Sequence, residues 1–177
     1  MTRTPSSVFV IIAVLLAVLG GIGFAAQDKY TVKVPNGPAL SEFRGYENWQ
    51  DVAVSQTETS LKVIVANPAM IGAYRNGIPG NGKHFPEGSK IVKIEWAAKK
   101  SAESPYFVMV PDTLKTVSVI EKDSKRFPDT NGWAYAQFMY DAASDKFKPS
   151  GSDAKCGYAC HTTVVAKDYI FTAYPNR

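Results

Sequence analysis

Five stretches of the chain have the β-branched and aromatic composition of β-strands. They are SLKVIVAN (60–67), SKIVKIEW (89–96), YFVMV (106–110), KTVSVIE (115–121) and GWAYAQFMY (132–140). The connections between these stretches are too short for the crossover helix that joins parallel strands. We therefore predict an α+β fold, mainly an antiparallel β-sheet with a few short helices.

Three other stretches are predicted to be helical. Ser41 can cap a short helix that runs through Trp49. Asn67 followed by Pro68 is typical of a helix start, and this second helix should end at Asn76-Gly77. The third is the segment CGYACHTTVV (156–165). Residues 78–88 are predicted to be a Gly/Pro loop and residues 141–155 a polar linker, and the stretch 168–174 closes the chain.

The N-terminus has the pattern of an export signal. Residues 8–26 form an unbroken apolar run, and Arg3 is the only charged residue before it. Small residues near the end of the run suit signal peptidase, with cleavage after Ala25 or Ala26. The alternative is an uncleaved membrane anchor, because a run of this length can nearly span a bilayer. In both cases we expect the rest of the chain to be exported, and we predict a periplasmic protein.

The length that remains is suited to one domain. We divide the chain into a signal peptide (1–26), an N-terminal arm (27–44) and a folded domain (45–177). Loss of Arg3 with the signal lowers the net charge of +4 by one, and the remaining charges of both signs are interspersed. No Lys/Arg stripe with interleaved aromatic residues is present, so we expect no nucleic-acid partner.

Both cysteines of the chain and one of its two histidines lie within the stretch KCGYACHTT. Cys156, Cys160 and His161 allow three chemistries: a disulfide, part of a zinc site, or covalent haem attachment. A redox disulfide belongs at the strand-to-helix turn of a βαβ unit, whereas this pair follows a polar linker near the C-terminus. A structural zinc site needs four ligands, and the spacing is wrong for a usual finger.

Haem attachment fits the motif best, because it uses two thiols and an adjacent imidazole. The motif is C-x-x-x-C-H, one residue longer than the usual C-x-x-C-H. Cysteines four positions apart, followed by a histidine, lie on roughly one helical turn. The second histidine, His84, lies in the Gly/Pro loop and is expected to face solvent, with a distal iron ligand as the alternative.

Three segments in the same order resemble the cytochrome P-460 family. They are FPEGSKIVKIEW (85–96), KDSKRFPDTNGWAYAQF (122–138), and CGYACH followed by KDYIFT (167–172). The resemblance extends over roughly residues 45 to 175. It implies a mainly antiparallel β domain that binds one haem c, usually as a homodimer. It also implies thioether links from Cys156 and Cys160 and a proximal iron ligand at His161, although the family usually has two residues between the cysteines.

Two more positions follow from the resemblance. Hydroxylamine-oxidising members carry a lysine that is bonded to the haem edge, and the matching residue is Lys93. Alternation places Lys93 on the same strand face as Ile91 and Glu95, so it faces either water or the haem. Those members also carry a distal carboxylate base, and the matching position holds Ser118. Glu121 is near in sequence, but in a strand it faces the opposite way from Ser118.

These observations lead to three functional hypotheses. The first is an exported mono-haem cytochrome that acts on hydroxylamine or nitric oxide at an open distal iron site and passes electrons to a redox partner protein. The second is a non-enzymatic gas-binding or electron-transfer protein, similar to the cytochromes c′-beta. The third is a haem-free binding domain with an incidental pair of cysteines. Ser118 in place of the acid leaves the first two about equally favoured.

Overall fold

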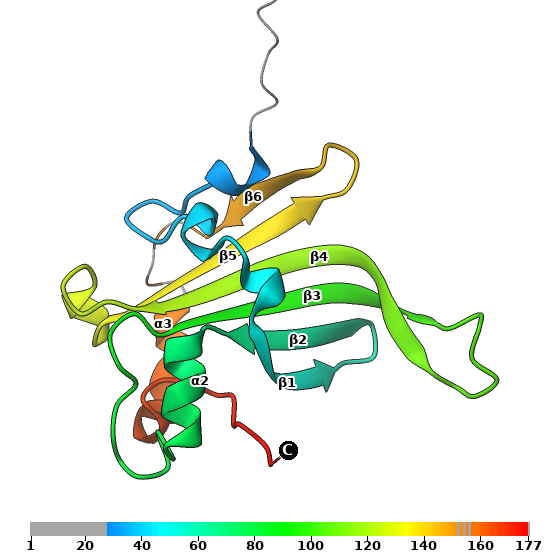
Figure 1. The fold of residues 1–177 in the computed structure, drawn as a ribbon. Coiled ribbons are helices and arrows are strands. Elements are labelled where there is room, and N and C mark those ends of the chain that lie inside the picture. The colour runs from blue at the N-terminus through cyan, green and yellow to red at the C-terminus, as the bar shows by residue number, and fades with distance from the viewer. Residues whose placement is uncertain (1–27, 152, 154, 156, 177) are drawn as a thin grey trace, which may run out of the picture.

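The computed structural model describes residues 28–151, 153, 155 and 157–176. A single six-stranded sheet forms the centre of the molecule (Figure 1). Its order is the order of the chain, and every neighbouring pair is antiparallel. The strands are β1 (Gln50–Gln56), β2 (Ser60–Ala66), β3 (Lys90–Lys100), β4 (Met109–Lys122), β5 (Trp133–Asp141) and β6 (Lys146–Ser150). The predicted α+β fold with a mainly antiparallel sheet is confirmed.

The two edge strands were missed in the sequence. Strand β1 lies where no strand was predicted, and β6 lies inside the predicted linker 141–155. Only Val52 is buried in β1 and only Phe147 in β6. Edge strands commonly carry polar and charged residues that discourage pairing with other chains. Such strands therefore lack the hydrophobic pattern by which the inner strands were recognised.

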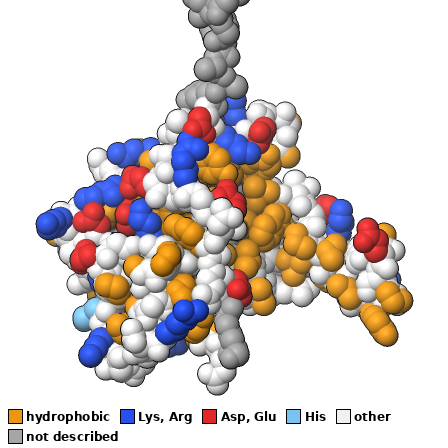
Figure 2. Space-filling model, viewed as in Figure 1, with side chains coloured by type: hydrophobic (Ala, Val, Ile, Leu, Met, Phe, Trp, Pro, Cys, Tyr) orange, Lys and Arg blue, Asp and Glu red, His pale blue; other side chains and the backbone are white. Residues whose placement is uncertain are grey.

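Strands β3 and β4 extend beyond their neighbours as a two-stranded ribbon (Figure 1). The predicted strand at 106–110 is confirmed only for Met109 and Val110, because 101–108 is the ribbon's loop, and β4 runs unbroken from Met109 instead of forming two strands. Pro111 fits this part of β4 because β5 pairs with β4 only from Thr116 onward, so the missing N–H breaks no bond to β5. Figure 2 shows hydrophobic side chains along the ribbon, and Tyr106 and Phe107 at its loop are 77% exposed.

Helices are few and short, as predicted. The α-helices are α2 (Pro68–Arg75) and α3 (Tyr158–His161). Asn67 caps α2 by accepting a hydrogen bond from the Met70 backbone N–H at 3.1 Å, which confirms the predicted start. The 3-10 turns are η1 (Lys29–Thr31), η2 (Leu40–Phe43), η3 (Tyr46–Asn48), η4 (Pro128–Thr130) and η5 (Thr162–Lys167).

The helix predicted from Ser41 through Trp49 is wrong. This segment forms the separate turns η2 and η3, and Ser41 lies inside η2 rather than at its cap. Gly45 separates the two turns with a φ of 81°, a left-handed conformation that ends helical geometry. The predicted helix over 156–165 is observed from Tyr158 as α3 and continues as η5.

Each face of the sheet is covered by a different part of the chain. The N-terminal segment, including Val34, Leu40 and Phe43, packs on one face with Val92 and Val119. Helix α2, the segment after α3 and the C-terminal tail cover part of the other face. Their side chains form a second cluster with the sheet, which includes Met70, Tyr74, Ile91, Trp133, Tyr135 and Ile170. The sheet extends beyond this second cover, and the exposed part of that face forms one wall of a pocket.

The described ranges contain no helix that is both long enough and apolar enough to cross a lipid bilayer. The predicted signal peptide over residues 1–26 lies outside the described residues.

Candidate functional site

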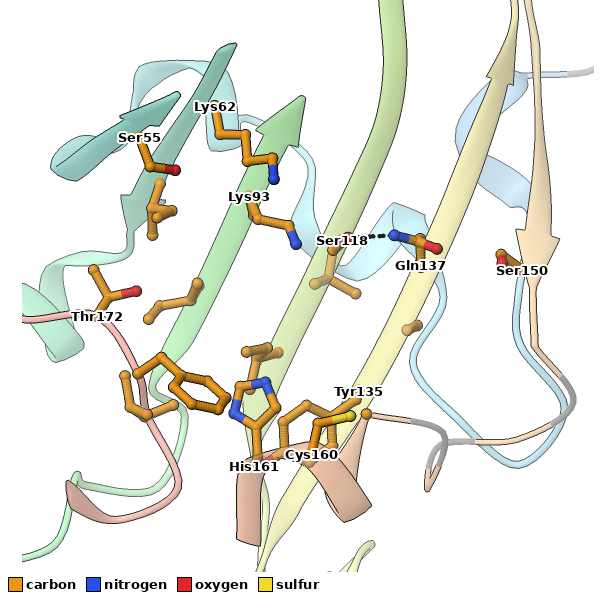
Figure 3. Close-up of a pocket in the computed structure, with 18 residues that line it drawn as sticks. Ser55, Lys62, Lys93, Ser118, Tyr135, Gln137, Ser150, Cys160, His161 and Thr172 are labelled. Carbon is orange, nitrogen blue, oxygen red and sulfur yellow. Dashed lines mark hydrogen bonds between the residues drawn. The ribbon is translucent and has the colours of Figure 1, made fainter. Parts of the chain in front are cut away.

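The pocket has a volume of about 560 Å³ and lies between the sheet, α3 and the C-terminal segment (Figure 3). All six strands contribute to its wall, because each has a side chain on this face. Four of the five predicted site residues line it together: Lys93, Ser118, Cys160 and His161. The other lining residues used below are Lys62, Ile64, Ile91, Ile120, Tyr135, Gln137, Ser150, Gly157, Ile170 and Phe171.

Strand register arranges the wall in two rows. One row crosses five strands and consists of Ile64, Lys93, Ser118, Gln137 and Ser150, each paired with the next. Figure 3 shows the last four of these side by side. Directly opposite side chains on neighbouring strands lie about 5 Å apart at Cβ. The row therefore places an amine, two hydroxyls and an amide along one line of the pocket.

The second row is hydrophobic and lies two residues along each strand, closer to α3. It consists of Ile91, Ile120 and Tyr135. The Tyr135 ring centroid is 4.5 Å from that of His161, so this row meets the helix. The pocket consequently has an apolar end beside His161 and a polar band farther along the sheet.

His161 is oriented by contacts on three sides. Its Nδ1 lies 2.5 Å from the carbonyl oxygen of Tyr169, and its ring makes an edge contact with Phe171 at 4.8 Å between centroids. Since a carbonyl can only accept, Nδ1 carries the proton and Nε2 is left with a free lone pair. Burial lowers the pKa of His161, and the charge of Lys93 lowers it further, while the Tyr169 hydrogen bond raises it. The neutral form that binds metals is thereby favoured.

An imidazole whose Nδ1–H is held by a carbonyl is the usual arrangement of a metal-bound histidine. Cys160 precedes His161 directly on α3 and is exposed at the pocket. Cys156 lies outside the described residues. Among the residues that are described, no three His, Cys, Asp or Glu side chains gather as a site for a bare metal ion. One imidazole and one thiol at an apolar pocket instead suit a flat, hydrophobic group that brings its own metal.

Gly157 allows α3 to lie this close to the sheet. A Cβ at this position would be 2.7 Å from Cβ and 2.8 Å from Cγ of Tyr135, distances that real Cβ atoms do not show. The residues on either side of the glycine are part of the C-x-x-x-C-H motif. The close approach of this motif to β5 therefore requires a residue without a side chain at position 157.

The G157A variant is expected to be less stable by about 1–3 kcal/mol, because the helix must move away from Tyr135. Urea unfolding of the purified protein measures this change. The matched control is G72A, since Gly72 lies within α2 and a Cβ there meets nothing within 4 Å. That variant should gain up to about 1 kcal/mol from helix propensity. Equal stability of G157A and the unmodified protein would contradict the close packing.

Lys93 faces the pocket, on the same side of β3 as Ile91, while Val92 and Ile94 point into the opposite core. The alternation predicted for this strand is confirmed. The Lys93 amine forms no hydrogen bond or ion pair with any residue that the structure describes. It is thus available to a group bound in the pocket. Lys62, on the neighbouring strand, also lines the pocket and lies 3.9 Å from Glu95.

Ser118 lies directly across from Lys93 and accepts a hydrogen bond from Nε2 of Gln137 at 3.2 Å (Figure 3). Glu121 is on the other face of β4, as predicted. There it pairs with Lys90 at 3.0 Å and Arg126 at 3.1 Å. No Asp or Glu is among the described residues that line the pocket.

His84 does not line the pocket. Its side chain is 75% exposed, and its Nδ1 lies 2.9 Å from a carboxylate oxygen of Asp168. The expectation of a solvent-facing loop histidine agrees with this position, and nothing places it near the distal side of the pocket.

Sequence reasoning missed Gln137 and Lys62 as pocket residues. The signal for Gln137 was present, because it alternates with Tyr135 and lies on the strand face of β5 that holds Tyr135. Lys62 could have been assigned only with the register between β2 and β3, which the sequence does not give. The hydrogen-bond partner of His161 is a backbone carbonyl, which has no sequence signature.

The pocket residues fit a haem group. Its size and apolar end can enclose a flat macrocycle, and His161 offers a nitrogen whose orientation is already fixed. In addition, the Tyr135 hydroxyl is buried and has no hydrogen-bond partner within the described part of the chain. A bound group at the pocket is one way in which such a buried donor finds a partner.

Comparison with known proteins supports this interpretation. The family model described as Cytochrome P460 matches residues 43–172, which agrees with the extent of the resemblance found in the sequence. No curated protein sequence matched the chain. The matched region contains every strand of the sheet, α3 and the pocket residues discussed above. The chain belongs to the cytochrome P460 family, whose members bind haem.

Proposed function

We propose that this protein is an exported mono-haem c-type cytochrome that acts on hydroxylamine or nitric oxide at an open distal iron site. The observation that carries the proposal is the geometry of His161. Its Nδ1 is held by the Tyr169 carbonyl, and its Nε2 is left for iron at the end of a pocket that Lys93 and Ser118 also line. The haem would supply the iron centre that binds the small molecule and exchanges electrons with it.

Cys156 and Cys160 would hold the haem by thioether bonds. In each bond the sulfur adds to a vinyl carbon and the thiol proton moves to the other vinyl carbon. Cys160 and His161 are neighbours on α3, so attachment and ligation come from one short helix. The predicted export signal supports this assignment, because c-type haem is attached outside the cytoplasm.

The open distal side would be the polar band of the pocket. Ser118 already accepts a hydrogen bond from Gln137, so its own hydroxyl proton can be donated to an oxygen of the bound molecule. Neither residue can remove a proton near neutral pH without a partner base. Lys93 lies directly across from Ser118, so its nitrogen is a further hydrogen-bond donor on this side of the pocket.

The alternative function is that of a gas-binding or electron-transfer protein of the cytochrome c′-beta type. It is favoured by the absence of a carboxylate among the described lining residues and by the hydrophobic row of Ile91, Ile120 and Tyr135. A redox partner protein and a homodimer are further expectations from the family resemblance.

One pair of measurements on the purified protein tests the proposal and separates the two functions. The reduced protein should bind carbon monoxide or nitric oxide, because the site is open. Hydroxylamine should be oxidised in the presence of an artificial electron acceptor. Gas binding without turnover would reject the oxidase and leave the alternative. Failure to bind either gas would reject the open site in both.

Lys93 is proposed to be bonded to the haem edge by an N–C bond that would replace one amine N–H bond and one haem C–H bond, with the two protons and two electrons passing to an oxidant such as a peroxide. Its amine lies half-buried at the pocket and has no partner among the described residues, which leaves it accessible to the edge of a bound haem. Peptide mapping should find the Lys93 peptide attached to haem, and K93R should lose a red shift of the Soret band. K62R is the matched control, because Lys62 also lines the pocket but lies beside Glu95. Identical spectra for K93R and the unmodified protein would reject the bond.

A further inference from the structure

A single buried carboxylate joins four segments of the chain beside the site. The Asp168 side chain is 2% exposed, and each of its contacts comes from a different residue. It pairs with His84 at 2.9 Å and accepts hydrogen bonds from the Phe85 backbone N–H at 2.8 Å and Nε1 of Trp133 at 3.3 Å. Lys122 provides the balancing charge at 3.2 Å, and its side chain is 8% exposed. Asp168 is therefore fixed from several directions.

The backbone at this carboxylate has an unusual conformation. Asp168 and Tyr169 are consecutive residues with φ of 49° and 64°, in the left-handed region that a residue as bulky as tyrosine rarely adopts. Such a corner persists only when its surroundings determine it strongly, and it is often found at functional sites. Here the carboxylate contacts of Asp168 hold one side of the corner. On the other side the Tyr169 ring stacks on Tyr158 of α3 at 5.5 Å.

The corner supplies the contact that orients His161. The Tyr169 carbonyl oxygen accepts from Nδ1 of His161, and its direction is set by the two left-handed residues. The charge of Asp168 also acts at the pocket, since it is one of the groups that raise the pKa of Tyr135, after burial and Tyr158. The sequence of contacts thus runs from Lys122 and Trp133 through Asp168 to the iron-ligand candidate.

We propose that Asp168 is a positioning residue for His161, holding the Tyr169 carbonyl against Nδ1 and thereby setting the strength of the imidazole as an iron ligand. This inference rests on the proposed function, because it concerns a ligand to haem iron. A firm Nδ1–H···O=C bond increases the basicity of a metal-bound imidazole. A nearby negative charge favours the oxidised metal. Both effects lower the reduction potential in the unmodified protein.

The test compares D168N with E121Q, each as purified haem protein. Glu121 is a matched control, because it is a buried carboxylate paired with Lys90 and Arg126, but on the opposite face of the sheet. In D168N the iron–histidine stretching band of the reduced protein should move to lower frequency. The reduction potential should rise by about 59 mV, which is a tenfold change in a one-electron equilibrium constant. E121Q should change neither, even if its stability falls.

D168N leaves the buried Lys122 without its carboxylate partner, so this variant can fail to fold. The double variant D168N/K122M removes both charges and keeps the lysine's hydrophobic volume, and it should still show the lower stretching frequency. If the iron–histidine stretching band is unchanged in the variant that can be purified, the proposed role of Asp168 is overturned. An equal shift in E121Q would overturn it as well.

The failure of this inference can be distinguished from that of the proposed function. If the unmodified protein contains no haem, the proposed function fails and this inference with it. If the protein contains haem but the iron–histidine band is unchanged in the variants, only the inference fails.

Discussion

The H161A variant should keep its haem but lose the protein ligand to iron. The thioether bonds from Cys156 and Cys160 do not depend on the imidazole, so the haem absorbance should survive denaturation. The iron–histidine stretching band of the reduced protein should disappear completely. The space left beside the Tyr135 and Phe171 rings, which lie 4.5 and 4.8 Å from the His161 ring, is suited to a free imidazole. Added imidazole should therefore restore the band.

The matched control is H84A, the variant of the other histidine. Because His84 is 75% exposed and does not line the pocket, its loss should leave the iron–histidine band in place. A band that survives in H161A and disappears in H84A would show that the ligand has been assigned to the wrong histidine. A band unaffected by either substitution would not be an iron–histidine mode, and a residue other than histidine would then hold the iron.

The S118E variant should oxidise hydroxylamine about 10²–10⁴ times faster than the unmodified protein, the range that a positioned general base contributes. Position 118 lies within the polar band of the pocket, directly across from Lys93. The Gln137 amide, which donates a hydrogen bond to the Ser118 oxygen, can donate to the new carboxylate and favour its ionised form, so the carboxylate can accept a proton at neutral pH. Turnover with an artificial electron acceptor measures the change.

S118Q is the control for S118E, since it has nearly the same size and no charge. It should show no gain, because an amide cannot take the proton. Equal rates for S118E and S118Q would mean that proton removal at this position does not limit the reaction. The missing carboxylate would then not explain a low activity of the unmodified protein. Gas affinity should be measured in parallel, to show that both variants keep an open site.

The inner part of the fold could be predicted from residue pattern. The inner strands carry alternating β-branched and aromatic residues. This alternation correctly predicted that Lys93 lies on the opposite face of its strand from Val92 and Ile94. The Asn67 cap likewise marked the start of α2. These features are local, because a strand face and a helix cap depend on residues close together in sequence.

Features set by tertiary contacts could not be predicted in this way. Strand β6 has one buried hydrophobic residue, Phe147, and gains its conformation from pairing with β5. The pairing of Ser118 with Lys93 and Gln137 depends on register, which is decided by the lengths of the intervening loops. The same is true of the left-handed corner at Asp168, whose partners come from distant segments.

The sequence predicted which side chains form the candidate site, but not the contacts that hold them in place. The C-x-x-x-C-H motif identified His161, and the family resemblance identified Lys93 and Ser118, which do line one pocket with it. Two contacts could not be predicted: the hydrogen bond from His161 to the Tyr169 carbonyl and the close approach of Gly157 to Tyr135. On the Tyr169 and Gly157 side, each is made by the backbone and has no side-chain pattern. Both decide how closely the motif approaches the sheet.

Covalent haem attachment at the C-x-x-x-C-H motif is the central claim, and the intact mass of the denatured, exported protein tests it most directly. The expected mass is that of the polypeptide from which the signal peptide has been cleaved plus one haem. The pyridine haemochrome spectrum of the same sample should be that of a c-type haem, and both signals should be lost when Cys156 and Cys160 are replaced by alanine. A mass equal to that of the bare polypeptide would contradict the claim.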